Sequence, residues 1–279
     1  MVTCRCGHVS TETAVAQMNP AEYDAMYRVE DTMWWYVGMR AILRTVVGER
    51  LENSRRVLDA GCGTGGTLAW WYRRAIHRHV AVVGAGIDLS PHALALGTRR
   101  GLTRLGRASV SALPFADRTF DGVFSLDVIY HLDVADDRSA LAELARVTKP
   151  GGWACVRVPA FDSLRSDHDV AVHTRERYRL PTLTEKIAQA GFAIDRATYA
   201  NTVLFPAAVA SRLLRRGAHA NSHGRREREP VTSDVRPASA LAQAIGGIAL
   251  RAETAMLRYA NLPIGLSAIV VATRPTDAT

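Results

Sequence analysis

Two hydrophobic periods alternate along the middle of the chain. Short β-branched runs typical of buried strands occur at 56–60, 80–88, 122–128, 154–160 and 192–199. Stretches with a helical period lie between them, at 67–77, 91–100 and 139–147. Alternation of this kind is typical of a parallel sheet with helices on both faces. The pattern therefore predicts an α/β, doubly wound core.

Helical patterns flank this core on both sides. From 18 to 51 they carry a dense run of aromatic residues and predict an N-terminal helical cap, preceded by an irregular leader over 1–17. A final strand-like run at 266–273 follows a long excursion over 201–264. Loops of that length are uncommon in compact domains. We expect the excursion to be a helical lid, partly disordered in its middle, inserted into a core formed by 52–200 and 265–275.

The composition of the chain excludes several protein classes. Hydrophobic residues make up 48% and charged residues 22% of the 279 positions, which argues against wholesale disorder and against a membrane bundle. The N-terminus lacks a secretory signal pattern, and the four cysteines make no disulfide framework. Cys4, Cys6 and His8 lack a second ligand pair at zinc spacing. We expect a soluble cytoplasmic protein without a metal site.

Basic residues give the chain a formal net charge of +8. Six arginines fall within 212–228, in a polar stretch that a solvated loop explains more simply than a binding patch. Nucleic-acid binding is therefore disfavoured. An amphipathic segment at 203–214 leaves peripheral contact with anionic lipid open.

A glycine-rich turn follows the first predicted strand, in the sequence Val57-Leu-Asp-Ala-Gly-Cys-Gly-Thr-Gly-Gly66. Gly61, Gly63 and Gly66 have the GxGxxG spacing, which lets the backbone turn tightly and approach a ligand closely. The spacing alone also fits a dinucleotide-binding enzyme, in which the helix N-terminus holds a pyrophosphate. A nicotinamide-dependent oxidoreductase is therefore a rival interpretation.

Further motifs separate the two interpretations. Asp59 lies two residues before Gly61, and in this D-x-G-C-G-T-G form the chain resembles class I S-adenosylmethionine (SAM) dependent methyltransferases. The stretch Leu113-Pro-Phe-Ala-Asp-Arg-Thr-Phe-Asp121 and the Pro150-Gly151 turn resemble the later motifs of small-molecule members, the methyltransferase type 11 group. The resemblance implies a seven-stranded Rossmann-like sheet, SAM as cofactor and S-adenosylhomocysteine as its product.

The resemblance also implies a set of cofactor contacts. The turn would lie against the methionyl part of SAM, Asp88 would accept hydrogen bonds from the ribose, and Ser109 stands where relatives commonly carry an adenine-binding Asp. Arg40 would pair with the methionyl carboxylate, and an aromatic ring of the N-terminal region would face the sulfonium unless the rings only pack in the core. The full predicted set is Tyr27, Trp35, Arg40, Asp59, Gly61, Cys62, Gly63, Asp88, Leu89, Ser109, Val110 and Asp127.

Three histidines are candidates for a general base. His131 follows the fourth predicted strand and titrates near neutral pH, although a structural role is an equal alternative. His168 and His173 follow the fifth strand, where the family presents residues that face the acceptor. The motif of base-methylating enzymes, N/D-P-P-Y/F, is absent. The sequence therefore predicts methyl transfer to an oxygen, nitrogen or carbon of a metabolite or natural-product intermediate, with a non-catalytic SAM-binding or nucleic-acid-binding protein as the alternative.

Overall fold

A seven-stranded sheet forms the centre of the molecule. The computed structural model describes residues 18–165, 169–170, 173–220 and 238–276. The strands lie in the order β3-β2-β1-β4-β5-β7-β6. Their bounds are β1 (Arg56–Ala60), β2 (Val83–Asp88), β3 (Leu105–Arg107), β4 (Phe120–Leu126), β5 (Thr148–Pro159), β6 (Ala193–Ala200) and β7 (Ser267–Thr273).

The predicted seven-stranded, doubly wound sheet is confirmed, and the strands predicted within 56–199 are parallel to one another, whereas the last strand makes the sheet a mixed one. β7 runs antiparallel to both β5 and β6, while the other strand pairs are parallel. The direction of β7 could not be predicted from the sequence, because β7 follows the long excursion over 201–264. β3 was also missed, because its three residues, Leu-Gly-Arg, carry no hydrophobic period.

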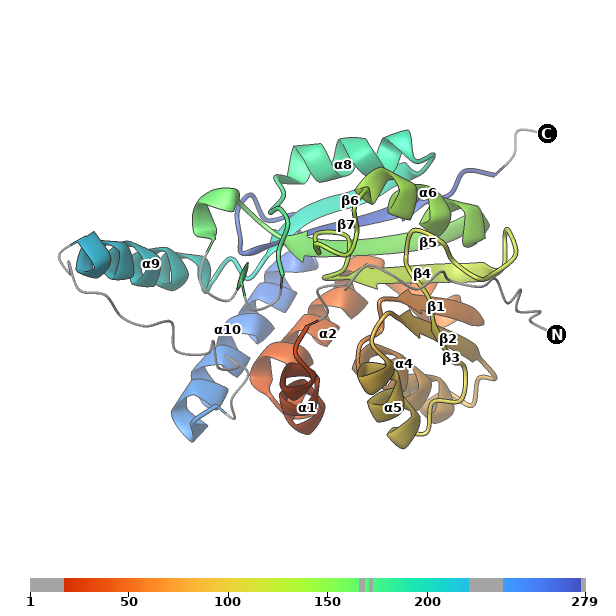
Figure 1. The fold of residues 1–279 in the computed structure, drawn as a ribbon, viewed down its shortest axis with the longest axis horizontal. Helices are drawn as coiled ribbons and strands as arrows, with labels where there is room; N and C mark the ends of the chain where they lie inside the picture. Colours follow the sequence, from red (N-terminus) through yellow and green to blue (C-terminus); the bar gives the residue numbers. More distant parts are fainter. Residues whose placement is uncertain (1–17, 166–168, 171–172, 221–237, 277–279) are drawn as a thin grey trace.

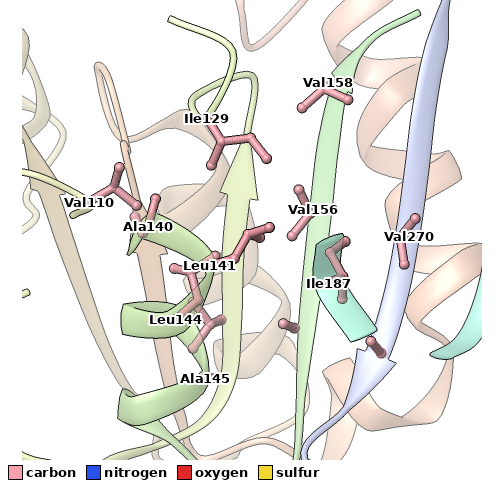
Figure 2. Packing of buried hydrophobic residues seen from close by; sticks show 14 of the residues in the cluster. Val110, Ile129, Ala140, Leu141, Leu144, Ala145, Val156, Val158, Ile187 and Val270 are labelled. Atoms are coloured by element: carbon pink, nitrogen blue, oxygen red, sulfur yellow. The ribbon is translucent and has the colours of Figure 1, made fainter. Parts of the chain in front are cut away.

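Helices cover both faces of the sheet (Figure 1). One face carries α6 (Asp137–Val147) and α8 (Leu180–Gln189), and the other carries α4 (Gly66–His77) and α5 (Pro91–Arg99). Figure 2 shows Leu141 and Leu144 of α6 and Ile187 of α8 packed towards Val156 and Val270 of the sheet. α8, which the sequence analysis did not predict, contributes Leu183 and Ile187 to this core.

The N-terminal region forms α1 (Pro20–Val29), α2 (Trp34–Val47) and α3 (Glu49–Asn53). Asn19 caps α1 by accepting a hydrogen bond from the Ala21 amide, and Pro20 takes the first helical position, where its missing N–H costs nothing. α2 buries an apolar stripe that includes Met39, Ile42 and Leu43 in the core on the α4 face. The cap is therefore an integral part of the domain.

The excursion forms α9 (Phe205–Ala220) and α10 (Ala240–Leu257). α10 packs along α2, with Gly246 against the Trp34 ring and Leu250 against Gly38, while α9 projects beyond the sheet (Figure 1). The lid role of 201–264 stays a prediction. The leader over 1–17 and the 221–237 part of the polar stretch lie outside the described residues. No helix in the described part of the chain is long and apolar enough to cross a membrane.

Candidate functional site

A cavity of about 290 Å³ opens at the carboxyl ends of β1, β2 and β4. In open α/β sheets, ligands bind at this edge because the loops that leave the strands diverge there. The N-terminal helices supply a further wall, through residues such as Tyr23, Met26, Trp35, Tyr36 and Met39. The cavity thus lies between the sheet edge and the helical cap.

The glycine turn forms the floor of this cavity. Gly61 has φ +89° and Gly63 has φ +52°, a left-handed backbone that favours glycine. The Asp88 carboxylate accepts hydrogen bonds from the amides of Gly63 at 2.8 Å and Ser90 at 2.9 Å. Asp88, at the end of β2, therefore holds the glycine turn that follows β1. Asp88 and the turn both line the cavity.

One buried carboxyl group, Asp59, and one half-buried carboxyl group, Asp88, lie at the turn. Burial and the nearby Asp88 carboxylate raise the pKa of Asp59 to about 8, from an ordinary value of 3.8. Burial also raises the pKa of Asp88, against the hydrogen bonds that it accepts from Ser90 and Gly63. Both side chains line the cavity. A cation in the cavity would relieve the cost of ionising them.

Glu30 connects the helical cap to the glycine turn. Its carboxylate accepts hydrogen bonds from the Thr64 hydroxyl and from the Arg100 guanidinium at 2.5 Å. Its backbone carbonyl accepts one from Arg40 at 2.7 Å. A side chain on Gly66 would collide with the Glu30 carboxylate, since a Cβ would stand 2.2 Å from Oε2. Glu30 was not predicted from the sequence as a site residue.

The structure separates the residues predicted on the N-terminal helices. Arg40 and Trp35 line the cavity, and Arg40 donates to the backbone carbonyls of Glu30 and Asp31. Tyr27 is not among the described residues that line the cavity. Its ring packs against Arg100, whose guanidinium carbon lies 4.3 Å from the ring centroid. The structure therefore brings Trp35 and Arg40 to the site and leaves Tyr27 outside it.

Asp127 also lines the cavity, and its carboxylate pairs with Arg157. Arg157 lies on β5, donates through Nε at 3.0 Å to Asp127, and places its guanidinium carbon 5.4 Å from the Trp35 ring centroid. Its pKa is raised, because the attraction of Asp127 outweighs burial. Arg157 was not predicted from the sequence, although a single charged residue inside the apolar run Ala-Cys-Val-Arg-Val is a usable signal.

The remaining predicted cofactor residues lie on the same cavity wall. Cys62, Leu89, Ser109 and Val110 all line it. The Ser109 hydroxyl accepts a hydrogen bond from the Ser111 amide at 3.2 Å, which positions the loop after β3. Burial, with the charge of Asp59, raises the pKa of the Cys62 thiol well above its ordinary value. Cys62 therefore stays an uncharged wall residue.

His131 and His173 come together on the opposite side. Their ring centroids lie 6.0 Å apart, and His131 Nδ1 lies 3.4 Å from a carboxylate oxygen of Asp133. Burial and the nearby His173 lower the pKa of His131 to about 4. His131 and Asp133 line the cavity, whereas His173 is not among the described residues that line it. His168 lies outside the described residues. Asp133 was not anticipated by the sequence analysis.

No cluster of three or more His, Cys, Asp or Glu side chains able to hold a metal ion occurs among the described residues. Several ionisable groups of the cavity are instead paired with one another or with backbone amides, as Arg157 is with Asp127 and Asp88 with Gly63. The site is therefore organised around buried carboxylates and two arginines.

Comparison with known proteins identifies this arrangement. Residues 58–156 match the family described as "Methyltransferase domain". The chain is 32% identical over 146 residues to the O-methyltransferase rstn1 of Aspergillus nomiae, covering 49% of this chain and 62% of the relative. It is 34% identical over 159 residues to the malonyl-[acyl-carrier protein] O-methyltransferase of Enterobacter lignolyticus, covering 57% and 52%. The chain thus spans between half and two thirds of the length of these curated relatives.

Solved structures share the fold across most of the chain. The phosphoethanolamine N-methyltransferase 2 of Haemonchus contortus, in complex with S-adenosyl-L-methionine, has a TM-score of 0.56 at 18% identity, covering 92% of this chain and 58% of that one. A putative methyltransferase in complex with the Haloferax volcanii Trm112 activator has a TM-score of 0.54 at 18% identity, covering 93% and 99%. With the glycine turn, Asp59 and Asp88 in place at the sheet edge, residues 58–156 form a methyltransferase domain, on a fold that the chain shares with solved methyltransferases.

Proposed function

We propose that the cavity binds SAM and that the chain transfers the methyl group to an oxygen of a small-molecule acceptor, a metabolite or natural-product intermediate. One observation carries the proposal. The glycine turn, Asp88 and Arg40 share a single cavity with His131, so that groups suited to a cofactor and a candidate base face the same space. The names of the two curated relatives, both O-methyltransferases, support oxygen as the nucleophile.

The charges of the cavity fit SAM. Asp59 is a buried and Asp88 a half-buried carboxyl group, and a cationic ligand would favour the ionisation of both. Arg40 uses part of its donor set on two backbone carbonyls, and the rest of its guanidinium can receive the methionyl carboxylate. The Asp88 carboxylate has lone pairs beyond the two amides it accepts from, which suit ribose hydroxyls.

SAM, when bound, supplies an activated methyl group, so the chain must orient the acceptor and exclude water. His131 is the group placed to accept a proton from a hydroxyl. Its pKa of about 4 keeps the imidazole uncharged at neutral pH, so a ring nitrogen is free to accept a proton, but the same lowering makes it a weak base in the free site. Tyr130, buried next to it, and the aromatic side chains of α2 surround the reacting space with apolar surface.

The cofactor assignment is tested by calorimetric titration of the full chain with SAM, S-adenosylhomocysteine and NAD. We expect SAM to bind with micromolar affinity, and Asp88→Asn to weaken binding by at least about tenfold because it replaces a carboxylate that accepts hydrogen bonds with an amide. Asp117→Asn is the matched control, since the Asp117 side chain is 70% exposed and lies outside the cavity lining. Binding of NAD without SAM would overturn the proposal.

The acceptor class is tested separately with isotope-labelled SAM. The chain is incubated with panels of small phenols, alcohols, carboxylic acids, amines and activated carbon acids, and the methylated position is assigned by mass spectrometry and NMR. Label appearing on oxygen supports the proposed nucleophile. Label found only on nitrogen or carbon contradicts the oxygen assignment while leaving the cofactor assignment intact.

A further inference from the structure

α10 has two apolar faces, of which the fold uses one. Its inner face packs on α2 and the sheet through Gly246, Ala249, Leu250 and Leu257, all buried. Its outer face carries large hydrophobic side chains that remain exposed. A surface helix of a globular protein ordinarily exposes polar residues on its outer side. The outer face of α10 departs from that rule.

Specific contacts fix which face of α10 points outward. Gly246 lies against the Trp34 ring, and a Cβ there would come within 2.3 Å of it. The Gln243 side chain accepts a hydrogen bond from the Trp34 amide at 3.0 Å and donates to the Thr32 carbonyl at 2.6 Å. The buried Glu253 carboxylate accepts from the Asn201 amide at 2.5 Å and the Val203 amide at 3.2 Å. Rotation of the helix would break all of these contacts.

The outer face is a continuous apolar stripe. On the helix, Leu241 is 70% exposed, Ile245 57%, Ile248 60% and Met256 41%, and they recur at helical intervals with the exposed Ala252 between them. Tyr259, which is 90% exposed, continues this spacing in the turn that follows the helix. These five account for nearly half of the eleven large hydrophobic side chains that are exposed in the described part of the chain. Over 18 residues the helix is about 27 Å long. We call the residues 241, 245, 248, 252, 256 and 259 the α10 stripe.

The charges of α10 favour an anionic partner. Arg251 and Arg258 are exposed and lie along one flank of the stripe. Glu253 is the helix's acidic residue, and it is buried on the opposite face and satisfied by backbone amides. The exposed surface of the helix is therefore apolar and positive, within a chain of formal charge +8. Apolar side chains beside arginine, without exposed acids, are typical of helices that lie in a lipid interface.

We propose that the α10 stripe binds the surface of an anionic phospholipid bilayer, with the helix lying in the plane of the interface. The apolar side chains enter the boundary between head groups and acyl chains, Tyr259 places its hydroxyl at the head-group level, and Arg251 and Arg258 contact lipid phosphates. The helix does not cross the bilayer, because no helix in the described residues has the apolar length for it. The proposal does not depend on the acceptor or on the cofactor.

Co-sedimentation of the full chain with vesicles tests the proposal. The probes are phosphatidylcholine vesicles containing about a quarter phosphatidylserine, and vesicles of phosphatidylcholine alone. We expect binding to the anionic vesicles that weakens with added salt. Ile245→Glu/Ile248→Glu should lower the partition coefficient at least about tenfold, and Arg251→Glu/Arg258→Glu should lower it on anionic vesicles by a similar factor.

Ile76→Glu is the matched control, because Ile76 on α4 is 68% exposed but lies outside the α10 stripe. It should leave vesicle binding unchanged. Circular dichroism, melting temperature and SAM affinity of every variant establish that it is folded. Failure of the wild-type chain to bind anionic vesicles overturns the proposal, as does equal loss with Ile76→Glu. A concentration-dependent dimer that the stripe variants abolish, without vesicle binding, would assign the face to a second copy of the chain instead.

Discussion

The hydroxyl of Thr64 donates a hydrogen bond to the buried carboxylate of Glu30. This contact joins the glycine turn after β1 to the segment between α1 and α2, and Arg100 and the backbone of Gly66 complete the surroundings of the carboxylate. The turn and the helical cap therefore share one buried polar group. Any change in that group alters both walls of the cavity together.

Loss of the Glu30 carboxylate should weaken SAM binding and the fold together. Glu30→Ala leaves the Thr64 hydroxyl and the Arg100 guanidinium without this partner, which we expect to cost about 1–3 kcal/mol of unfolding free energy. SAM affinity should fall about tenfold, since the turn loses its support. Denaturant unfolding and calorimetry measure the two effects. Glu49→Ala, at an exposed position on α3, is the control, and an unchanged SAM affinity in Glu30→Ala would disprove the link.

Gly61 should tolerate no side chain. A Cβ there would stand 2.2 Å from Cγ2 of Val128, and its φ of +89° is strained for any L side chain. Gly101 has a similar φ of +86° with nothing within 4 Å of the Cβ position. We therefore expect both Gly61→Ala and Gly101→Ala to lose stability through backbone strain, and Gly61→Ala alone to lose SAM binding. Melting curves and SAM titrations of both variants measure these effects. Gly101→Ala reports backbone strain alone, and the additional loss in Gly61→Ala reports the clash with Val128.

Asp59 should make SAM binding depend on pH. With a folded pKa of about 8, the carboxyl is largely protonated at neutral pH, and a bound cation favours its ionisation. SAM affinity should therefore rise with pH, by up to about tenfold per unit below pH 8, and should do so less in Asp59→Asn. The amino group of SAM titrates in the same way in experiments with the wild type and with Asp59→Asn. The difference between the two pH profiles of SAM affinity therefore reports the Asp59 carboxyl alone. Parallel pH profiles for the two proteins would count against this ionisation.

The same carboxyl should affect stability with the opposite sign. Between the ordinary pKa of 3.8 and about 8 the folded chain holds a proton that the unfolded chain releases, so the stability contribution of Asp59 falls as pH rises through this window. Asp59→Asn removes the titration. We expect urea unfolding to show a smaller loss of stability between those pH values in the variant than in the wild type.

His131 should act as an uncharged base across the neutral range. Because its folded pKa is about 4, below its ordinary value of 6.5, turnover should show no inflection near pH 6.5 from this group. His131→Asn should lower kcat by about a hundredfold or more for a hydroxyl acceptor while leaving SAM affinity nearly unchanged. A variant with full turnover would give His131 a structural role. In acid, the wild type should lose more stability than the variant between pH 6.5 and 4, since protonation there favours the unfolded chain.

The predictable parts of the fold are those with local signals. β1, the glycine turn and α4 follow from an apolar run, a glycine spacing and a helical period, and Asp88 follows from its place at the end of β2. The direction of β7 and the existence of β3 had no such signal. The direction of β7 depends on its pairing with strands that are distant in the sequence, and β3 is only three residues long.

The site was predictable where it lies on the turn and unpredictable where it depends on packing between elements. Tyr27 belongs to an aromatic run that also contains Trp35, yet only the orientation of α1 and α2 decides that Trp35 reaches the cavity while Tyr27 packs on Arg100. Glu30 and Thr64 stand 34 residues apart in sequence, so their contact exists only in the folded chain.

β6 and β7 are antiparallel neighbours, with Ala200 paired to Ser267 at the edge of the sheet where the cavity opens. A pair of strands joined in this way requires only a short turn. The whole connection between Ala200 and Ser267 is therefore dispensable for closing the sheet. The connection nevertheless carries part of the core, because α10 buries Leu250 and Leu257 against α2 and the sheet, so any replacement for it would have to supply that packing together with whatever new surface it presents.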